Sequence, residues 1–572
     1  MSLQLFRNIL RLFDKKHRYY IGFIFSIFVL LMFLELFSIT LFIPLISFIL
    51  ETKISENSFY LFFKNSFNLD LAFILNDLKT FILFFIAIFL IKSFLTIFCH
   101  YHKIGFTYKI RKYLTTNIYQ KYLNLSYENF IKENSSKYLK NINFEIKTVS
   151  EGLLQSLEFF SEIIVIVGLA IFLLNYNLEA SIIILSISLL FIYLISIITK
   201  KKIFQLGDRI RNFEQFRLKN YLESFNLIKE IKIFNKEKFF KNRDLKLTSE
   251  SLQNDFLFRF IKSVPRILIE LLLIVIFLFI IIVNIGQYDT KYMLELLAIF
   301  GASAFRLMPS VNRIINSLQA LRFALPSTNN IINELSTQTN GLFSSVKGKK
   351  IIKFNNNILF SNVHFKYKKS KKYIFKDLSL NISRGKIVGI KGKTGSGKTT
   401  IANLISGLID PTDGLLMIDQ VDYKDLDIKS LHKLIGYVPQ DVYLMDTTIK
   451  ENITFGSEDL KKNDIEEAVR KANLDEFVEE LPEGLNTIIG EKSGKISGGQ
   501  AQRIGIARAI VKKPSILIFD EATNSLDINT EEQIMSGIKK LKGELSIIVI
   551  SHNSNCLKIC DEIIDLDEKS AK

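Results

Sequence analysis

The chain divides into two halves that differ in the spacing of their hydrophobic residues. The first half contains long runs of Phe, Ile and Leu, whereas the second half alternates short apolar runs with polar segments, as a soluble α/β protein does. A helix needs about 20 mostly apolar residues to cross a bilayer. Six runs come close to that length, at residues 20–43, 81–99, 153–174, 180–198, 267–283 and 292–308. We therefore predict six transmembrane helices.

The connections between these runs predict how the helices continue beyond the membrane. The connections after the second and fourth runs are long, basic and helical in period, whereas those after the third and fifth runs are short. Because Lys and Arg gather in cytoplasmic loops, we place both long connections, the N-terminus and the second half of the chain in the cytoplasm. Each long connection is expected to be a pair of helical extensions that turn back near residues 126–134 and 221–226.

The connection at residues 51–79 is the longest on the outer side. Its phenylalanines have the spacing of a short amphipathic helix lying on the membrane surface. A packed external cap would have the same pattern, so both interpretations stay open.

Length and charge narrow the classes of protein. With 572 residues, the chain is expected to form at least two domains. Its net charge of +17 would suit a nucleic-acid partner, but no nucleic-acid-binding motif is visible, and cytoplasmic lysines in a membrane protein account for the charge. The three cysteines form neither a disulfide framework nor a paired metal motif. We predict a transmembrane domain at residues 1–325, a linker at 326–350 and a soluble α/β domain at 351–572.

Residues 392–399, with the sequence GKTGSGKT, match the phosphate-binding P-loop. An apolar run at 387–390 predicts a buried strand before the loop, and a helix start is predicted after it, which is the context that this loop requires. The loop's backbone N–H groups bind phosphate, Lys398 can reach the β- and γ-phosphates, and the Thr399 hydroxyl can bind Mg²⁺. The predicted phosphate-binding residues are Gly392, Thr394, Gly395, Ser396, Gly397, Lys398, Thr399 and Thr400.

Two further motifs follow the P-loop in a fixed order. Residues 496–500 read ISGGQ, and residues 516–521 are four apolar residues followed by Asp520 and Glu521. This order resembles the ATP-binding cassette (ABC) proteins, in which the first motif is the signature and the second is the Walker B strand. Ile496 stands where the family usually has leucine. The resemblance implies an α/β P-loop nucleotide-binding domain behind an all-α domain of six transmembrane helices, with ATP and Mg²⁺ as cofactors.

The same resemblance implies roles for the remaining site residues. Asp520, Thr399 and Gln440 would hold Mg²⁺, and Gln440 would also touch the attacking water. Glu521 would act as general base. Lys398 and His552 would stabilise the γ-phosphate, although Asn553 follows His552 where relatives often have arginine.

Two further motifs concern the nucleotide site. Tyr367 occupies the place of the aromatic residue that stacks on adenine, or it is an ordinary strand aromatic. Residues 524–527 resemble the D-loop of the family.

A single cassette implies a partner. In ABC proteins the signature of one subunit closes on the ATP that the P-loop of the other subunit holds, and here the signature residues are Ser497, Gly498, Gly499 and Gln500. A symmetric homodimer would complete both sites. The resemblance also implies that the two cytoplasmic turns, together with the segment before the signature at 490–495, transmit cassette closure to the membrane helices.

Six spans followed by one cassette resemble the exporter (type IV) architecture over the whole chain, which drug, peptide, lipid and glycolipid exporters share. Residues 264–270 and 305–314 are similar to the PglK-type flippases. These move polyprenyl-pyrophosphate-linked oligosaccharides for protein glycosylation. We therefore expect an ATP-driven flippase in a bacterial inner membrane that moves such a lipid-linked oligosaccharide to the outer leaflet. The alternative is an exporter of drugs, peptides or lipid A-like lipids, and intact Glu521 and His552 disfavour a channel or regulator with little hydrolysis.

Three cations in the predicted spans indicate where a pyrophosphate headgroup could bind. Lys92, Arg266 and Arg306 each lie in or near the cytoplasmic half of a span, and charged residues at such depth usually face a cavity or a partner. Arginine suits phosphate through its forked geometry. Alternatively, Arg266 pairs with Glu270 one helical turn away, and Lys92 extends its ammonium group towards the membrane surface.

Overall fold

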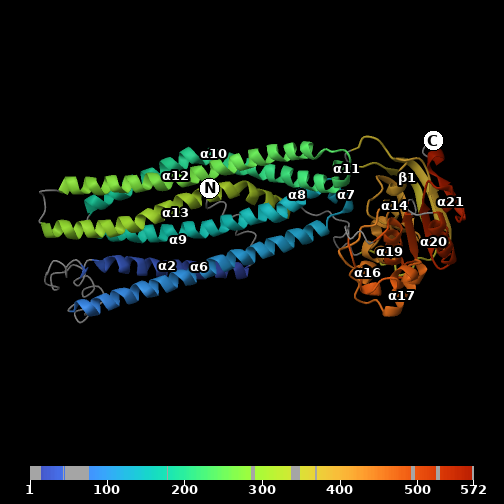
Figure 1. Cartoon of the computed structure of the whole chain (residues 1–572), viewed down its shortest axis with the longest axis horizontal. Coiled ribbons are helices and arrows are strands. Elements are labelled where there is room, and N and C mark those ends of the chain that lie inside the picture. Colours follow the sequence, from blue (N-terminus) through green and yellow to red (C-terminus); the bar gives the residue numbers. More distant parts are fainter. Residues whose placement is uncertain are drawn as a thin grey trace. The chain divides into compact units, whose positions relative to one another are not determined.

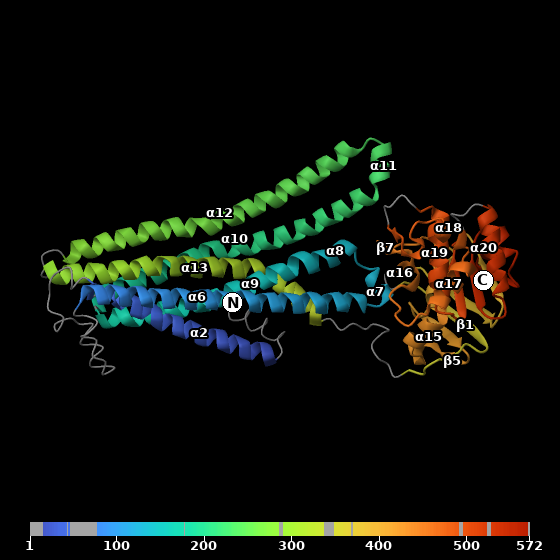
Figure 2. The same cartoon turned by 60° about the horizontal axis from the view of Figure 1, so that its bottom comes forward.

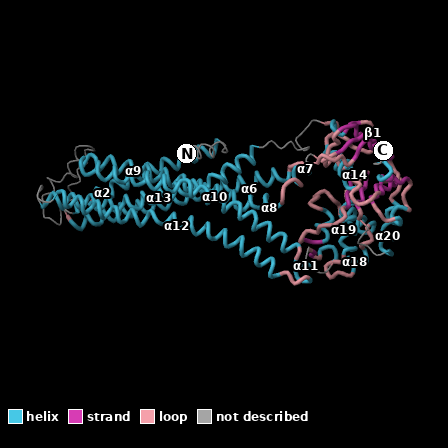
Figure 3. Tube along the Cα trace, turned by 90° about the horizontal axis from the view of Figure 1, so that it is seen from above, coloured by secondary structure: helices cyan, strands magenta, loops and turns pink. Residues whose placement is uncertain are grey.

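The computed structural model of the chain divides into two compact units. The first comprises Met1–Leu123 and Glu133–Gln338 and is helical, and the second comprises Asn124–Lys132 and Thr339–Lys572. Every described strand belongs to the second unit (Figure 3). The structure describes residues 15–42, 44–45, 77–176, 178–284, 290–336, 348–367, 370–490, 496–522 and 528–569. Most of the predicted external connection at 51–79, all but Gly490 of the predicted segment at 490–495, and the predicted segment at 524–527 lie outside the described residues.

The helical unit consists of long helices that run alongside one another (Figures 1 and 2) and contain five of the six predicted runs, together with residues 20–40 of the first run. They are α2 (Lys15–Thr40), α6 (Leu78–Leu123), α9 (Ile146–Tyr176), α10 (Leu178–Asn226), α12 (Glu237–Asn284) and α13 (Thr290–Ser336). Within the described part of the chain, three helical stretches are long and apolar enough to cross a membrane: His17–Thr40, Leu78–Leu123 and Ser135–Asn175. The last three predicted runs lie in α10, α12 and α13, where many side chains are outside the described residues.

The long helices continue past their apolar runs, as the basic periodic connections predict. The first predicted turning point, at 126–134, contains the short helix α7 (Tyr127–Phe130), which belongs to the second unit. The second, at 221–226, falls inside α10, which ends at Asn226. The chain turns back a few residues later, through the short helix α11 (Ile228–Ile233) between α10 and α12. Helix α13 continues to Ser336, so the segment predicted as a linker at 326–350 begins inside this helix.

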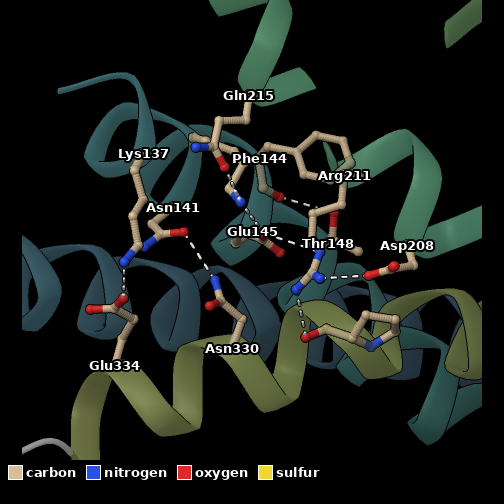
Figure 4. A network of polar contacts seen from close by, with 12 residues as sticks. Lys137, Asn141, Phe144, Glu145, Thr148, Asp208, Arg211, Gln215, Asn330 and Glu334 are labelled. Atoms are coloured by element: carbon tan, nitrogen blue, oxygen red, sulfur yellow. Dashed lines mark hydrogen bonds and ion pairs between the residues drawn. The ribbon is translucent and has the colours of Figure 1, made fainter. Parts of the chain in front are cut away.

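A buried polar network joins the start of α9 to α10 (Figure 4). The chain enters α9 through a π-helical turn, η2 (Asn141–Glu145), after the short helix α8 (Ser135–Lys140). The fully buried Glu145 carboxylate lies 3.2 Å from Lys140 Nζ and 3.9 Å from Arg211 Nε of α10. Lys140 also donates a hydrogen bond to Gln215 of α10 at 3.1 Å. Cations from two helices therefore compensate a carboxylate that water does not reach.

In the second unit, a parallel sheet brings the predicted motifs together. Its strand order is β11-β3-β10-β9-β6. The strands are β3 (Ile387–Lys391), β6 (Ile435–Val438), β9 (Ile516–Asp520), β10 (Ser546–Ile550) and β11 (Glu562–Asp565). β9 and β10 are buried along their whole length, which explains their unbroken apolar runs. Because the strands are parallel, the segments that follow β3, β10 and β9 all lie at one edge of the sheet.

The P-loop helix packs between this sheet and a second, antiparallel one. The antiparallel sheet has the order β2-β1-β4-β5. Its strands are β1 (Asn357–Phe365), β2 (Phe375–Ser383), β4 (Asp413–Ile418) and β5 (Val421–Asp422). Ile401 of α14 (Lys398–Ile405) belongs to one buried cluster with Phe360 of β1 and Ile390 of β3. A separate cluster joins Leu517 of β9 to Ile506 of α19 (Gly498–Ile510), so helices pack on more than one side of the parallel sheet.

Candidate active site

The P-loop connects β3 to α14 and has the backbone of an anion-binding loop. Gly395 and Gly397 have φ angles of +87° and +96°, which residues with a side chain rarely adopt. A Cβ atom on Gly397 would lie 2.4 Å from the Phe375 ring. Ser396 Oγ is buried and has no hydrogen-bond partner among the described residues. Since α14 begins directly after the loop, a phosphate there would meet a helix N-terminus and would give Ser396 a partner.

Three of the predicted catalytic residues meet around one carboxylate. Lys398 is buried and donates to the carbonyl oxygens of Gly392 and Lys393 at 2.8 and 3.2 Å. Its Nζ lies 3.4 Å from Oε1 of Glu521, and His552 Nδ1 lies 3.8 Å from the same oxygen. These residues follow β3, β9 and β10, which are neighbours in the sheet. The strand order therefore explains why motifs far apart in the sequence form one site.

The predicted metal ligands offer oxygen atoms at the same edge of the sheet. The Asp520 carboxylate ends β9, where burial raises its pKa and a hydrogen bond with Thr399 partly opposes that rise. Carboxylate and hydroxyl oxygens are the ligands that Mg²⁺ prefers, so the pair fits this ion. Gln440 follows β6 and is exposed, while the preceding Pro439 carbonyl accepts a hydrogen bond from Gln502 of α19 at 3.1 Å.

The signature motif forms the N-terminus of α19. Ser497 Oγ accepts a hydrogen bond from the Gln500 N–H at 3.2 Å, and the Ser497 N–H donates to Gln500 Oε1 at 2.8 Å. This reciprocal capping box fixes the first turn of the helix, which begins with Gly498 and Gly499. The positive end of the helix dipole lies here. The role of the signature motif towards the ATP of a second copy stays a prediction.

Tyr367 lies just after β1 and is partly buried against the core of the second unit. Its ring packs edge-on against Phe365, with 5.0 Å between the ring centroids. This position is compatible with adenine stacking and with an ordinary strand aromatic.

Glu531, which the sequence did not single out, anchors the loop that carries His552. The Asn553 amide donates to both carboxylate oxygens of Glu531 at 3.1 and 3.3 Å, and Cys556 Sγ donates to one of them. Glu531 lies in α20 (Ile528–Lys540) and is buried. Asn553 is therefore a neutral partner for the Glu531 carboxylate, at a position where the resemblance implies that relatives often have arginine. Nothing local in the sequence links α20 to this loop, because only the fold brings them together.

In the helical unit, the three cations predicted for a headgroup site do not lie together. Lys92 Nζ of α6 is 3.2 Å from Glu35 Oε1 of α2, and Arg306 Nε of α13 donates to the same carboxylate. Arg266 is separate, since it pairs with Glu270 at 3.1 Å and its side chain is 69% exposed. The structure thus groups Lys92 with Arg306 and places Arg266 in the local pair that was the alternative expectation.

Two carboxylates complete a set that we call the intramembrane cluster, comprising Glu35, Lys92, Glu162, Arg306 and Arg313. Glu162 of α9 lies 3.6 Å from an Arg306 guanidinium nitrogen and accepts a hydrogen bond from Arg313 Nε at 2.6 Å. Sequence reasoning singled out cations and omitted these acids. The rule that charged groups within a membrane are normally paired would have found them, since Glu35 and Glu162 lie within the first and third predicted spans.

Comparisons with known proteins agree with this geometry. Residues 375–524 match the family described as ABC transporter. The putative multidrug export ATP-binding/permease protein YgaD of Bacillus subtilis is 41% identical over 208 residues, which are 36% of each chain. The alpha-hemolysin translocation ATP-binding protein HlyB of Proteus vulgaris is 39% identical over 225 residues, which are 39% of this chain and 32% of that protein. The chain thus matches only about a third of the length of these relatives.

A likeness in fold extends over nearly the whole chain. The structure of a bacterial Atm1-family ABC exporter with ATP bound superimposes with a TM-score of 0.81 at 21% identity, and the match covers 97% of this chain and 95% of that one. The predicted fold class is confirmed. The chain consists of a helical transmembrane domain with the fold of an Atm1-family exporter, followed by an ABC transporter ATP-binding domain.

Proposed function

We propose that the chain is one subunit of an ATP-driven exporter, in which ATP hydrolysis moves a substrate across a membrane. The observation that supports this most directly is the meeting of Lys398, Glu521 and His552 at one edge of the sheet. Helices of membrane-spanning length in the other unit add a path for the substrate. We place the protein in a bacterial inner membrane with both termini in the cytoplasm. This orientation puts the Lys- and Arg-rich connections on the cytoplasmic side, where such residues gather in membrane proteins.

The residues at the sheet edge suit phosphoryl transfer to water, which requires a positioned water and neutralised phosphate charge. Glu521 takes the proton of the attacking water, while Lys398 and His552 face the γ-phosphate oxygens. Thr399, Asp520 and Gln440 would hold Mg²⁺, which supplies further positive charge to the phosphates. Lys398 is paired with Glu521. Binding of ATP would exchange that carboxylate for phosphate and free Glu521 to act on water.

The first test is Glu521→Gln in the purified full-length protein. ATP binding should persist, while turnover should fall by about 10²–10⁴-fold, the usual contribution of a general base. Because the signature would act on the ATP of a second copy, this variant should accumulate as an ATP-bound homodimer, visible by native mass spectrometry. Glu532→Gln, at an exposed position of α20, is the control. Turnover by Glu521→Gln at the rate of the control would refute the general-base role.

For the substrate, we propose a polyprenyl-pyrophosphate-linked oligosaccharide that moves from the cytoplasmic to the outer leaflet. Support comes from the intramembrane cluster, in which three cations face two carboxylates. A pyrophosphate would compete with Glu35 for Lys92 and Arg306. Arginine binds phosphate and carboxylate with the same forked geometry, so this exchange needs no new donor.

This proposal is tested by flipping in reconstituted vesicles. Arg306→Ala and Lys92→Ala together should abolish flipping of a pyrophosphate-linked glycolipid and leave basal ATP hydrolysis largely intact. Arg266→Ala, which lies outside the cluster, should change flipping less. Lys201→Ala, an exposed cation of α10, is the control. Undiminished flipping by the double variant would rule out the headgroup site.

The second candidate is an exporter of drugs, peptides or lipid A-like lipids. The similarity to YgaD and HlyB, named as a putative multidrug export protein and an alpha-hemolysin translocation protein, favours this class. It predicts that ATP hydrolysis is stimulated by such compounds and that their transport is indifferent to Lys92, Arg266 and Arg306.

A further inference from the structure

A tyrosine next to the predicted metal site has no assigned role. Tyr437 lies in β6, which pairs with β9 so that Tyr437 stands opposite Ile518. Side chains alternate along a strand, so Ile518 and Asp520 point to the same face of the sheet. The Tyr437 hydroxyl reaches along this face and donates a hydrogen bond to Asp520 Oδ2 at 3.0 Å.

We propose that Tyr437 is a positioning residue for the divalent cation, because its hydroxyl holds one oxygen of Asp520 and leaves the other directed to the metal. The proposal rests on the proposed function, in which Asp520 serves the Mg²⁺ of ATP. A carboxylate ligand that lacks an outer partner can rotate, and outer partners typically contribute 10- to 100-fold to metal affinity. Tyr437 suits this role because a neutral donor orients Asp520 without replacing the metal's positive charge.

The surroundings of Asp520 make this hydrogen bond consequential. Asp520 is only 4% exposed, so solvent cannot readily replace a lost donor. A buried acceptor that loses its donor stays without a hydrogen bond, and the energetic cost is larger when the acceptor is charged. Thr399, the other oxygen ligand, is also hydrogen-bonded to Asp520. Tyr437 and Thr399 together therefore restrict the carboxylate.

The test is Tyr437→Phe in the purified full-length protein, with Mn²⁺ replacing Mg²⁺ so that metal binding is read directly by electron paramagnetic resonance. With a non-hydrolysable ATP analogue present, the variant should bind Mn²⁺ about 10-fold more weakly than the wild type. Nucleotide affinity measured in EDTA should be unchanged, because the phosphates bind to the P-loop without the metal.

Tyr423→Phe is the matched control. Tyr423 is buried in the same domain, and its hydroxyl donates to the Ile405 carbonyl oxygen at 2.9 Å, away from Asp520. Equal Mn²⁺ affinity of Tyr437→Phe and the wild type would overturn the proposal, and so would an equal loss in Tyr423→Phe. A wild-type protein that binds no Mn²⁺ with nucleotide would instead refute the proposed function, so the two failures are distinguishable.

Discussion

Arg306 of α13 donates a hydrogen bond to the Glu35 carboxylate of α2, although the two residues are 271 positions apart in the chain. The contact ties the first long helix of the transmembrane domain to the last. Lys92 shares the same carboxylate, and Ser38 accepts a hydrogen bond from Lys92 at 3.3 Å. A single acid therefore neutralises cations from two other helices within the bundle.

Glu35→Gln should destabilise the transmembrane domain. The substitution leaves Lys92 and Arg306 without their shared anion, and breaking a buried pair costs about 3–5 kcal/mol. Thermal unfolding in detergent should show a clear fall in Tm. Glu270→Gln removes the partly exposed partner of Arg266 and should change Tm little. Equal Tm values for the two variants would contradict a structural role for Glu35.

The ion pair of Lys140 and Glu145 predicts that the stability losses of the two single variants do not add up in the double variant. Lys140→Met leaves the buried Glu145 with one remaining cation among the described residues, Arg211 at 3.9 Å, so a loss of about 3 kcal/mol in unfolding free energy is expected. Lys140→Met with Glu145→Leu removes both charges and should recover most of that loss. A double-mutant cycle on unfolding measures the coupling. Additive losses would show that the two residues act independently.

Close packing of α10 against α13 predicts that alanine substitutions at two glycines change the stability of the helical unit in opposite directions. A Cβ on Gly207 would lie 2.8 Å from the Phe323 backbone oxygen, whereas a Cβ on Gly105 of α6 meets nothing within 4 Å. Gly207→Ala should therefore cost about 1–3 kcal/mol through overpacking. Gly105→Ala should stabilise by up to about 1 kcal/mol, since alanine favours a helix. Unfolding of both variants in detergent checks the difference, and stabilisation by Gly207→Ala would contradict the packing.

The contact between Asn553 and Glu531 predicts how the loop of His552 is held. Asn553→Ala removes two hydrogen bonds to a buried carboxylate, so the ATP-binding domain should lose about 2 kcal/mol of stability. Asn553→Arg should restore it by supplying a cation. Asn555→Ala, which removes a more exposed contact with Lys558, is the control. Hydrogen exchange of the segment around His552 reports the loosening, and unchanged protection in Asn553→Ala would refute the anchor.

The fold class and the core of the nucleotide site could be predicted because their signals are local. A run of apolar residues predicts a buried strand, and the residues directly after it must lie at the end of that strand. Lys398, Glu521 and His552 each follow such a run, and the structure brings them together. Tyr437 and Glu531 could not be found this way, since each acts through a partner on another element.

The sequence by itself determined that this protein has membrane-length helices followed by an ATP-binding domain, because helix length, apolar content and short motifs do not depend on distant contacts. Only the tertiary structure decided which charges of the helical unit meet. Lys92 and Arg306 share Glu35, whereas Arg266 pairs within its own helix. The physical reason is that an apolar run gives the length of a helix but not its rotation or its neighbours, and both of these set the distance between charged side chains.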